Sequence, residues 1–235
     1  MIDILYIKGK KSDNDDLEML YSLRSLEKNV TDYNRVFITG ECPDFIDKTK
    51  IIFTPARDSG MAMINHWLKV TQTIEQTDIS SDFVLMYDDI FFLKPTQLTN
   101  YPYYKKGILG ESNVGGFVYQ KNMLNTKKWL LDHGYTYFDY CLHIPCIYNR
   151  DKFLQLKPIL EPYKDGYESM SCRSLYGNIF LSDQPTRPDV KVRTKDDEIP
   201  FESNCFSVSD EAFNYKTLDY LKERYKNKSK FEKTS

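Results

Sequence analysis

Two adjacent aspartates, Asp88 and Asp89, directly follow an apolar run in Asp-Phe-Val-Leu-Met-Tyr-Asp-Asp-Ile-Phe-Phe-Leu-Lys-Pro (residues 82–95). The run 83–87 lacks polar alternation, which predicts a strand buried on both faces of an α/β sheet. Ligands of such sheets bind where the strands end. Neighbouring carboxylates repel each other, so their burial requires a divalent cation or another positive partner, and oxygen ligands favour Mg²⁺ or Mn²⁺. The alternative is an Asp-Asp turn in solvent that caps the strand.

The composition is that of an ordinary globular protein. The 235 residues are 41% hydrophobic and 14% aromatic, enough for one substantial core, so we expect a single domain. No apolar stretch reaches the roughly 20 residues of a membrane helix, and the N-terminus lacks signal-peptide features, so we expect a cytoplasmic protein without a membrane anchor. The net charge of -2 indicates no tight nonspecific binding to nucleic acid. Five irregularly spaced cysteines predict reduced thiols.

Strands and helices are expected to alternate in the first 95 residues. We predict strands over 3–9, 35–39, 50–54 and 83–87, and helices over 15–30 and 62–77. In the second helix, apolar residues recur every three or four positions and so face the sheet, while Asn65 and Lys69 share another face. These apolar residues are Met63, Trp67, Val70 and Ile74. The order predicts a mostly parallel, Rossmann-like sheet flanked by helices.

The second half of the chain is less regular. We predict a strand over 114–120 and helices over 124–133, 150–157, 167–177 and 215–227. Segment 183–204 holds three of the ten prolines and is expected to be a long loop, which in a compact domain is usually functional or disordered. Residues 222–235 carry six Lys or Arg against two Glu, which predicts a solvated, frayed terminus.

The segment 82–95 resembles the acidic metal motif of nucleotide-sugar glycosyltransferases with the GT-A fold. More closely, it resembles the Asn-Asp-Asp-aromatic motif of Stealth-type sugar-phosphate transferases and of small glycosyltransferases of bacteriophages. The strand at 3–6, the helix at 21–27 and the strand at 37–41 resemble the same group, so the resemblance covers roughly residues 3–180. This chain has Tyr87 where Stealth-type motifs commonly have Asn. That difference favours simple glycosyl transfer over sugar-phosphate transfer.

The resemblance implies a GT-A-like domain with a nucleotide-sugar-binding half (1–95), an acceptor half (96–214) and a C-terminal helix with a basic tail (215–235). It implies a donor such as a UDP-sugar, with Mn²⁺ or Mg²⁺ neutralising its pyrophosphate as the glycosidic bond breaks. Asp89 would be a direct metal ligand, and Asp88 a ligand or a ribose contact. A bacteriophage-encoded enzyme would act in the host cytoplasm.

Other residues resemble positions that hold the donor in this group. Asp58, Asn65 and Lys69 match positions that contact the base and phosphates, although Lys69 could equally be an exposed helical lysine. The resemblance makes Arg173 a phosphate contact, with an ordinary serine-capped helix start as the alternative. It makes His143 a metal ligand or a phosphate contact, whereas a lone histidine beside apolar residues is more often a satisfied core residue.

Three carboxylates are candidates for the base that would activate the acceptor. Asp139 lies four residues before His143 and could act on an acceptor hydroxyl if the enzyme inverts configuration. Glu111 and Glu168 are the rival candidates, and the remaining alternative is a retaining enzyme without a dedicated protein base.

The acceptor is predicted from a surface in which cations alternate with aromatics, and which could stack a base or a sugar ring. Its members are Tyr101, Tyr103, Tyr104, Lys105, Lys106, Lys121, Lys127, Lys128 and Trp129. The leading expected acceptor is a hydroxymethylated pyrimidine in phage DNA. The alternatives are a surface polysaccharide, modified by glycosyl or by Stealth-type sugar-phosphate transfer, and a non-catalytic module that binds nucleic acid or glycan.

Overall fold

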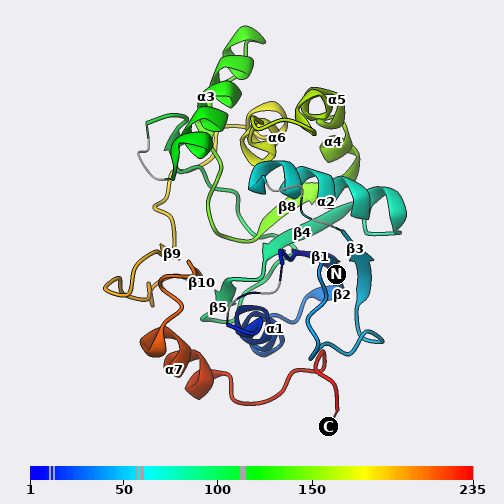
Figure 1. The fold of residues 1–235 in the computed structure, drawn as a ribbon, viewed down its shortest axis with the longest axis vertical. Helices are drawn as coiled ribbons and strands as arrows, with labels where there is room; N and C mark the ends of the chain where they lie inside the picture. Colours follow the sequence, from blue (N-terminus) through cyan, green and yellow to red (C-terminus); the bar gives the residue numbers. More distant parts are fainter. Residues whose placement is uncertain (11, 13, 57, 59–60, 112–114, 235) are drawn as a thin grey trace.

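A five-stranded sheet forms the centre of the protein in a computed structural model, which describes residues 1–234 except 11, 13, 57, 59–60 and 112–114 (Figure 1). The strands follow the order β3 (Ile52–Pro55), β2 (Tyr33–Gly40), β1 (Ile2–Ile7), β4 (Asp82–Tyr87) and β8 (Cys146–Asn149). The first four are parallel to one another, whereas β8 pairs with β4 in the antiparallel sense. The predicted α/β class with a mostly parallel central sheet is confirmed.

Helices cover both faces of this sheet, as the unbroken apolar strands predict. α1 (Leu17–Asn29) and α2 (Ala62–Gln76) lie on opposite faces (Figure 1). Because side chains alternate along a strand, Ile4 of β1 enters the core on the α1 side and its neighbour Leu5 enters the core on the α2 side. The residues of α2 expected to face the sheet do pack in that second core, namely Met63, Trp67, Val70 and Ile74.

A second sheet continues directly from the first. Its strands are, in order, β5 (Ile90–Phe92), β10 (Cys205–Val208) and β9 (Lys191–Val192). Only Asp88 and Asp89 separate β4 from β5, so the two aspartates form the link between the sheets. α7 (Tyr215–Arg224) packs on this sheet through Leu221, which shares a core with Phe206 of β10. The predicted loop 183–204 is therefore mostly irregular, but it contains the short strand β9.

Helices α3 (Phe117–Asp132), α4 (Arg150–Leu154), α5 (Lys157–Leu160) and α6 (Cys172–Phe180) lie beyond α2, on the side of the molecule away from α1 (Figure 1). The remaining elements are β6 (Gly107–Ile108), β7 (Phe138–Asp139) and the 3₁₀ helix η1 (Glu161–Tyr163). β6 and β7 pair in an antiparallel ribbon. α6 contacts α2, α3 and α4, which brings the N-terminus of α6 towards the end of β4.

Two predictions in this region are wrong, one on the type of element and one on where a helix begins. Residues 117–120 begin helix α3 rather than ending a strand, while Val114 lies outside the described residues. Aromatic and β-branched residues such as Phe117 and Val118 gave a strand preference, which the helical continuation through Asp132 overrides. The helix predicted from residue 167 begins only at Cys172, because Ser171 is its N-cap and accepts a hydrogen bond from the backbone of Ser174.

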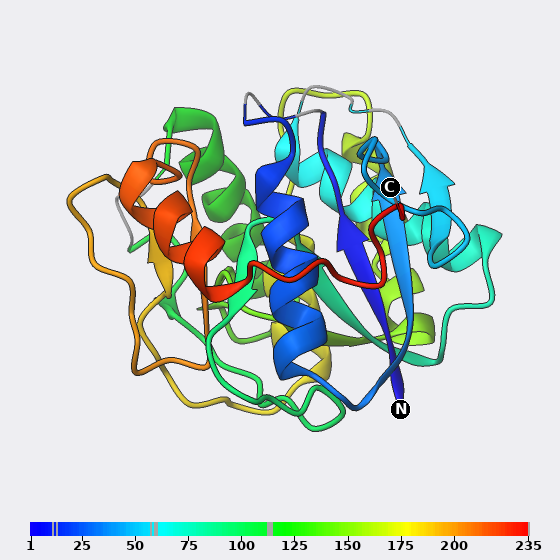
Figure 2. The same ribbon diagram turned by 90° about the horizontal axis from the view of Figure 1, so that it is seen from below.

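The C-terminal segment is also not a frayed terminus. Phe231 is 1% exposed, and its carbonyl accepts a hydrogen bond of 2.8 Å from the backbone of Asp47. Glu232 forms an ion pair of 2.7 Å with Arg24 of α1. Figure 2 shows this last segment crossing α1 towards β2. The prediction failed because it relied on the number of charged residues and did not consider Phe231, whose apolar side chain packs in the core.

Candidate functional site

A cavity of about 410 Å³ opens where β1 and β4 end. Its wall comes from the turn after β4, the first turns of α2, the start of α6, the segment 141–143 and β9. It brings together all the residues predicted to hold the donor or a metal, namely Asp58, Asn65, Lys69, Asp88, Asp89, His143 and Arg173. The cavity lies at the carboxyl ends of parallel strands, where ligands of α/β sheets usually bind, and its size suits a small-molecule ligand.

Each of the two aspartates is paired with a lysine. Asp88 lies 3.4 Å from the ammonium of Lys8, and Asp89 lies 2.9 Å from that of Lys191. The same oxygen of Asp89 accepts a hydrogen bond of 2.8 Å from Ser207, while its other oxygen is buried without a hydrogen-bond partner in the described structure. Burial, reinforced by the charge of Asp89, raises the pKa of Asp88 to about 6 despite the attraction of Lys8. The Asp-Asp turn is therefore not a solvent-exposed cap.

Lys69 of α2 extends its side chain to the end of β1. It is 2% exposed, so the alternative of an exposed helical lysine is wrong. Its ammonium forms an ion pair with Asp58 and donates a hydrogen bond of 2.8 Å to the carbonyl of Lys8. Gly40 permits this arrangement, because a Cβ at that position would lie 1.9 Å from the same carbonyl oxygen. Asn65 lines the cavity one helical turn earlier.

Arg173 projects from the first turn of α6. One guanidinium nitrogen donates a hydrogen bond of 2.7 Å to the carbonyl of Leu142, and the group lies over the ring of Tyr87 at 5.2 Å from its centroid. Unlike Lys8, Lys69 and Lys191, it forms no ion pair with any described carboxylate. Among the residues that the structure describes, no carboxylate balances the charge of Arg173 in the cavity, which favours an anionic ligand.

His143 is held in one orientation by Asp189. Its Nδ1 lies 2.8 Å from one oxygen of Asp189, and its backbone N–H donates to the other oxygen at 3.0 Å. Burial lowers the pKa of His143, so the ring is neutral at neutral pH. A neutral ring that donates through Nδ1 keeps its lone pair on Nε2, which can accept a proton or bind a ligand.

Asp189 was missed in the sequence because nothing in its immediate neighbourhood marks it. The available signal was the long loop 183–204, which was expected to be functional or disordered. The side chain is further fixed by Arg193, whose guanidinium lies 2.8 Å from it. Burial alone would raise the pKa of Asp189. Hydrogen bonds from Nδ1 and the backbone N–H of His143, together with the charge of Arg193, lower this pKa overall, so Asp189 remains a carboxylate.

A second buried histidine, His66 of α2, also lines the cavity. Its Nδ1 lies 2.6 Å from the hydroxyl of Tyr87, and its Nε2 is buried without a hydrogen-bond partner in the described part of the chain. Burial, with the charge of Arg173, holds the pKa of His66 well below its ordinary value. Sequence patterns gave no reason to select it, because its position on the helix resembles that of a core residue.

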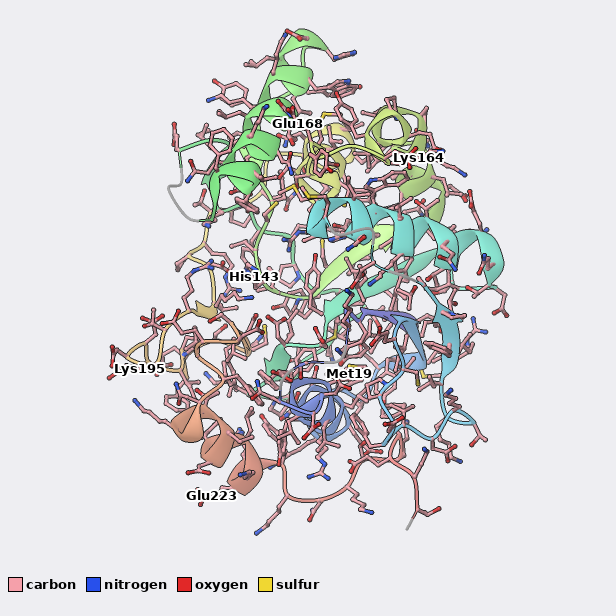
Figure 3. All side chains as sticks on the ribbon, in the orientation of Figure 1. Met19, His143, Lys164, Glu168, Lys195 and Glu223 are labelled. Atoms are coloured by element: carbon pink, nitrogen blue, oxygen red, sulfur yellow. The ribbon has the colours of Figure 1, made fainter. Side chains whose placement is uncertain are left out.

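The three carboxylates proposed as base do not line the cavity. Asp139 is 3% exposed, and one of its oxygens accepts a hydrogen bond of 2.8 Å from the backbone of Cys141. Glu111 is exposed, and Glu168 forms an ion pair with Lys121 near α3, apart from His143 (Figure 3). The pairing of β7 with β6 buries Asp139 in a structural role, so its position does not support a role as base.

Four members of the predicted surface of cations and aromatics are buried or paired within the protein. Tyr101 is 5% exposed and belongs to the core. Lys105 is paired with Asp183, Lys121 with Glu168 and Lys128 with Asp132. Because carboxylates of the protein neutralise these lysines, they do not form a continuous basic patch for a phosphate backbone.

The cavity does not present a ready metal centre. Within the described residues, no group of three or more His, Cys, Asp or Glu side chains is placed to hold a metal ion. Lysine ammonium groups contact both aspartates, and His143 faces Asp189 through Nδ1. The donor set expected from the resemblance, Asp88, Asp89 and His143, therefore does not fit Mn²⁺ or Mg²⁺ in this arrangement.

None of the helices in the described part of the chain is both long and apolar enough to span a membrane. No protein-family model and no curated protein matches the sequence.

Proposed function

We propose that the protein is a glycosyltransferase of GT-A-like fold that takes a sugar from a nucleotide-sugar donor bound in this cavity. The observation that carries the proposal is the guanidinium of Arg173, which forms no ion pair with a described carboxylate and lies in the same cavity as Lys69 and Lys191. A nucleoside diphosphate is an anion of suitable size and charge for such a site. The resemblance of residues 82–95 to nucleotide-sugar enzymes points to the same class of ligand.

In this proposal, cationic side chains stabilise the leaving group. Negative charge grows on the diphosphate as the glycosidic bond breaks, and preorganised donors in a partly buried site stabilise that charge more than water does. Arg173 supplies a planar fork suited to phosphate oxygens. The first turn of α6, from which it projects, adds the partial positive charge of a helix N-terminus.

His143 replaces Asp139 as the proposed base. Its Nε2 carries the lone pair, because Nδ1 faces the carboxylate of Asp189 at 2.8 Å. The acceptor hydroxyl would give its proton to Nε2 as the new glycosidic bond forms, and Asp189 would stabilise the resulting imidazolium. Asp189 is thus a positioning residue.

We retain a hydroxymethylated pyrimidine in DNA as the proposed acceptor. The support for this acceptor is the resemblance to small bacteriophage glycosyltransferases. A surface glycan is the rival acceptor.

The test is mass spectrometry of the products formed from a panel of nucleotide sugars, with hydroxymethylcytosine-containing DNA and in its absence. Nucleoside diphosphate that appears with that DNA, together with a matching mass gain on the base, would establish the proposed reaction. Donor cleavage without DNA modification would redirect the search to glycan acceptors. Release of a nucleoside monophosphate would indicate sugar-phosphate transfer. Tight donor binding without turnover would indicate a binding module.

Variants separate the proposed roles. Arg173→Gln should lower kcat by about 100-fold or more, as loss of a charge-stabilising donor does in other enzymes. Arg150→Gln is the matched control, because Arg150 belongs to α4 and does not line the cavity. His143→Gln should lower kcat while donor affinity stays unchanged. Equal activity of Arg173→Gln and the unaltered protein would contradict the proposed site.

A further inference from the structure

The positive charge beside the two aspartates is supplied by the protein itself. The ammonium groups of Lys8 and Lys191 lie 3.4 Å and 2.9 Å from carboxylate oxygens of Asp88 and Asp89. The oxygen of Asp89 that contacts Lys191 also accepts a hydrogen bond from Ser207, and the other oxygen is buried. A metal ion at the oxygen that contacts Lys191 would have to displace this arrangement, and a metal ion at the other oxygen would have to reach an atom buried from solvent.

Lys191 is placed by the second sheet. Lys191 of β9 stands opposite Ser207 of β10 in the strand register, and β10 pairs with β5, which begins directly after Asp89. Lysine, hydroxyl and carboxylate therefore come from adjoining strands of one sheet. The side chain of Lys191 is 16% exposed and lines the cavity, so its ammonium is accessible to a ligand there.

Lys8 is fixed at the end of β1. It is 2% exposed, its ammonium also pairs with Asp16 at 2.9 Å, and its backbone N–H donates to the carbonyl of Thr39. Its carbonyl is held by Lys69 at 2.8 Å. A divalent ion bound between the two aspartates would lie within a few ångströms of both ammonium groups, and like charges at that separation repel strongly.

We propose that Lys8 and Lys191 stand in for a divalent cation at the Asp88–Asp89 turn, so that the protein binds nucleoside diphosphates without added metal. Lys191 and Arg173 contact the diphosphate, while Asp89 and Ser207 hold Lys191 in position. This inference rests on the proposed function, and it replaces the Mn²⁺ or Mg²⁺ dependence that the sequence resemblance implies.

Calorimetric titration with UDP, GDP, CDP and ADP, in EDTA and separately in MnCl₂, tests the inference. For the nucleotide that binds, we expect the dissociation constants in the two conditions to agree within about threefold, a difference of less than 1 kcal/mol. Electron paramagnetic resonance of Mn²⁺ gives a second readout, and the spectrum of free Mn²⁺ should be unchanged by the protein. Both measurements use the unaltered protein, so they do not depend on a variant that folds.

A lysine variant then assigns the role. Lys191→Met should weaken diphosphate binding in EDTA by about tenfold or more, the loss expected for one charge-assisted contact. Lys195→Met is the matched control, because Lys195 is exposed in the same loop and lies at its outer edge (Figure 3). Circular dichroism melting checks that each variant is folded.

The outcomes distinguish this inference from the proposed function. Diphosphate binding that requires MnCl₂ overturns the lysine inference and leaves the glycosyltransferase proposal in place. Metal-free binding that Lys191→Met does not weaken also overturns it. If no nucleoside diphosphate binds in either condition, the proposed function fails, and the inference fails with it.

Discussion

At the scale of single residues, Asp88 is held in an environment that disfavours its charged form. Burial and the neighbouring Asp89 raise its pKa from 3.8 to about 6, although Lys8 opposes the shift. An acid with a raised pKa in the folded protein binds protons more tightly there than in the unfolded chain. The contribution of Asp88 to stability therefore falls as the pH rises from 3.8 to about 6 and stays low above that range.

We expect Asp88→Asn to raise the free energy of unfolding near pH 7.5 by about 1–3 kcal/mol, since each pKa unit corresponds to about 1.4 kcal/mol. The difference from the unaltered protein should shrink to nearly zero below about pH 3, where Asp88 is protonated in both states. Urea unfolding across this pH range measures the effect. Asp151→Asn, at an exposed carboxylate on α4, is the control and should change little at any pH. A less stable Asp88→Asn protein near pH 7.5 would contradict this account.

At the scale of elements, the end of β2 must pass very close to the end of β1. Gly40 has φ +120°, and an added Cβ would lie 1.9 Å from the carbonyl oxygen of Lys8. That carbonyl also accepts the hydrogen bond of Lys69, which in turn pairs with Asp58. One glycine therefore allows two strands and α2 to meet at the cavity.

Gly40→Ala should destabilise the protein by about 3 kcal/mol or more, because backbone strain and a steric clash combine. Gly134→Ala is a suitable control, since Gly134 also has positive φ, +75°, but an added Cβ there meets nothing within 4 Å. The control should lose only about 1–2 kcal/mol, the cost of left-handed backbone for alanine. Thermal and urea denaturation compare the two, and similar losses would show that the approach to Lys8 is not critical.

The elements that could be predicted from the sequence are those with a regular apolar period. The strands around 3–9 and 83–87 and the helix at 62–77 follow from burial on one or both sides, and each is observed close to the predicted position. The strand prediction for residues 117–120 was wrong because their local preference is overridden by the longer helix that begins with them. Local periodicity carries no information about such competition.

The residues of the cavity can likewise be divided into those that the sequence could predict and those that it could not. The residues after β4 and along α2 could be predicted because strand ends and helix faces place them. The contacts of Lys191 with Asp89 and of Asp189 with His143 could not, since they join residues about 100 and 46 positions apart. Such pairs form only when segments far apart in the sequence have folded together.

At the scale of the whole molecule, the last described residues hold together elements from the start of the chain. Phe231 belongs to the core on the α1 side of the sheet, and Glu232 is tied to Arg24. The backbone of Lys233 donates a hydrogen bond of 2.9 Å to the carbonyl of Phe45. The segment acts as a clasp across α1 and the loop after β2.

Phe231→Ala should therefore cost about 3–5 kcal/mol of stability, the usual range for removal of a buried phenylalanine side chain. Phe201→Ala is the matched control, because Phe201 is 55% exposed, and it should cost less than about 1 kcal/mol. Equilibrium unfolding in urea measures both. A loss for Phe231→Ala no larger than that of the control would mean that the clasp is not coupled to the core.

The clasp also bears on how the protein is made. During synthesis the first two β-α units leave the ribosome long before residues 229–233 exist, and β5 must likewise wait for β10 as its pairing partner. The nascent chain therefore carries an incompletely closed apolar surface until residues 229–233 have emerged, a period during which chaperones and proteases compete for it.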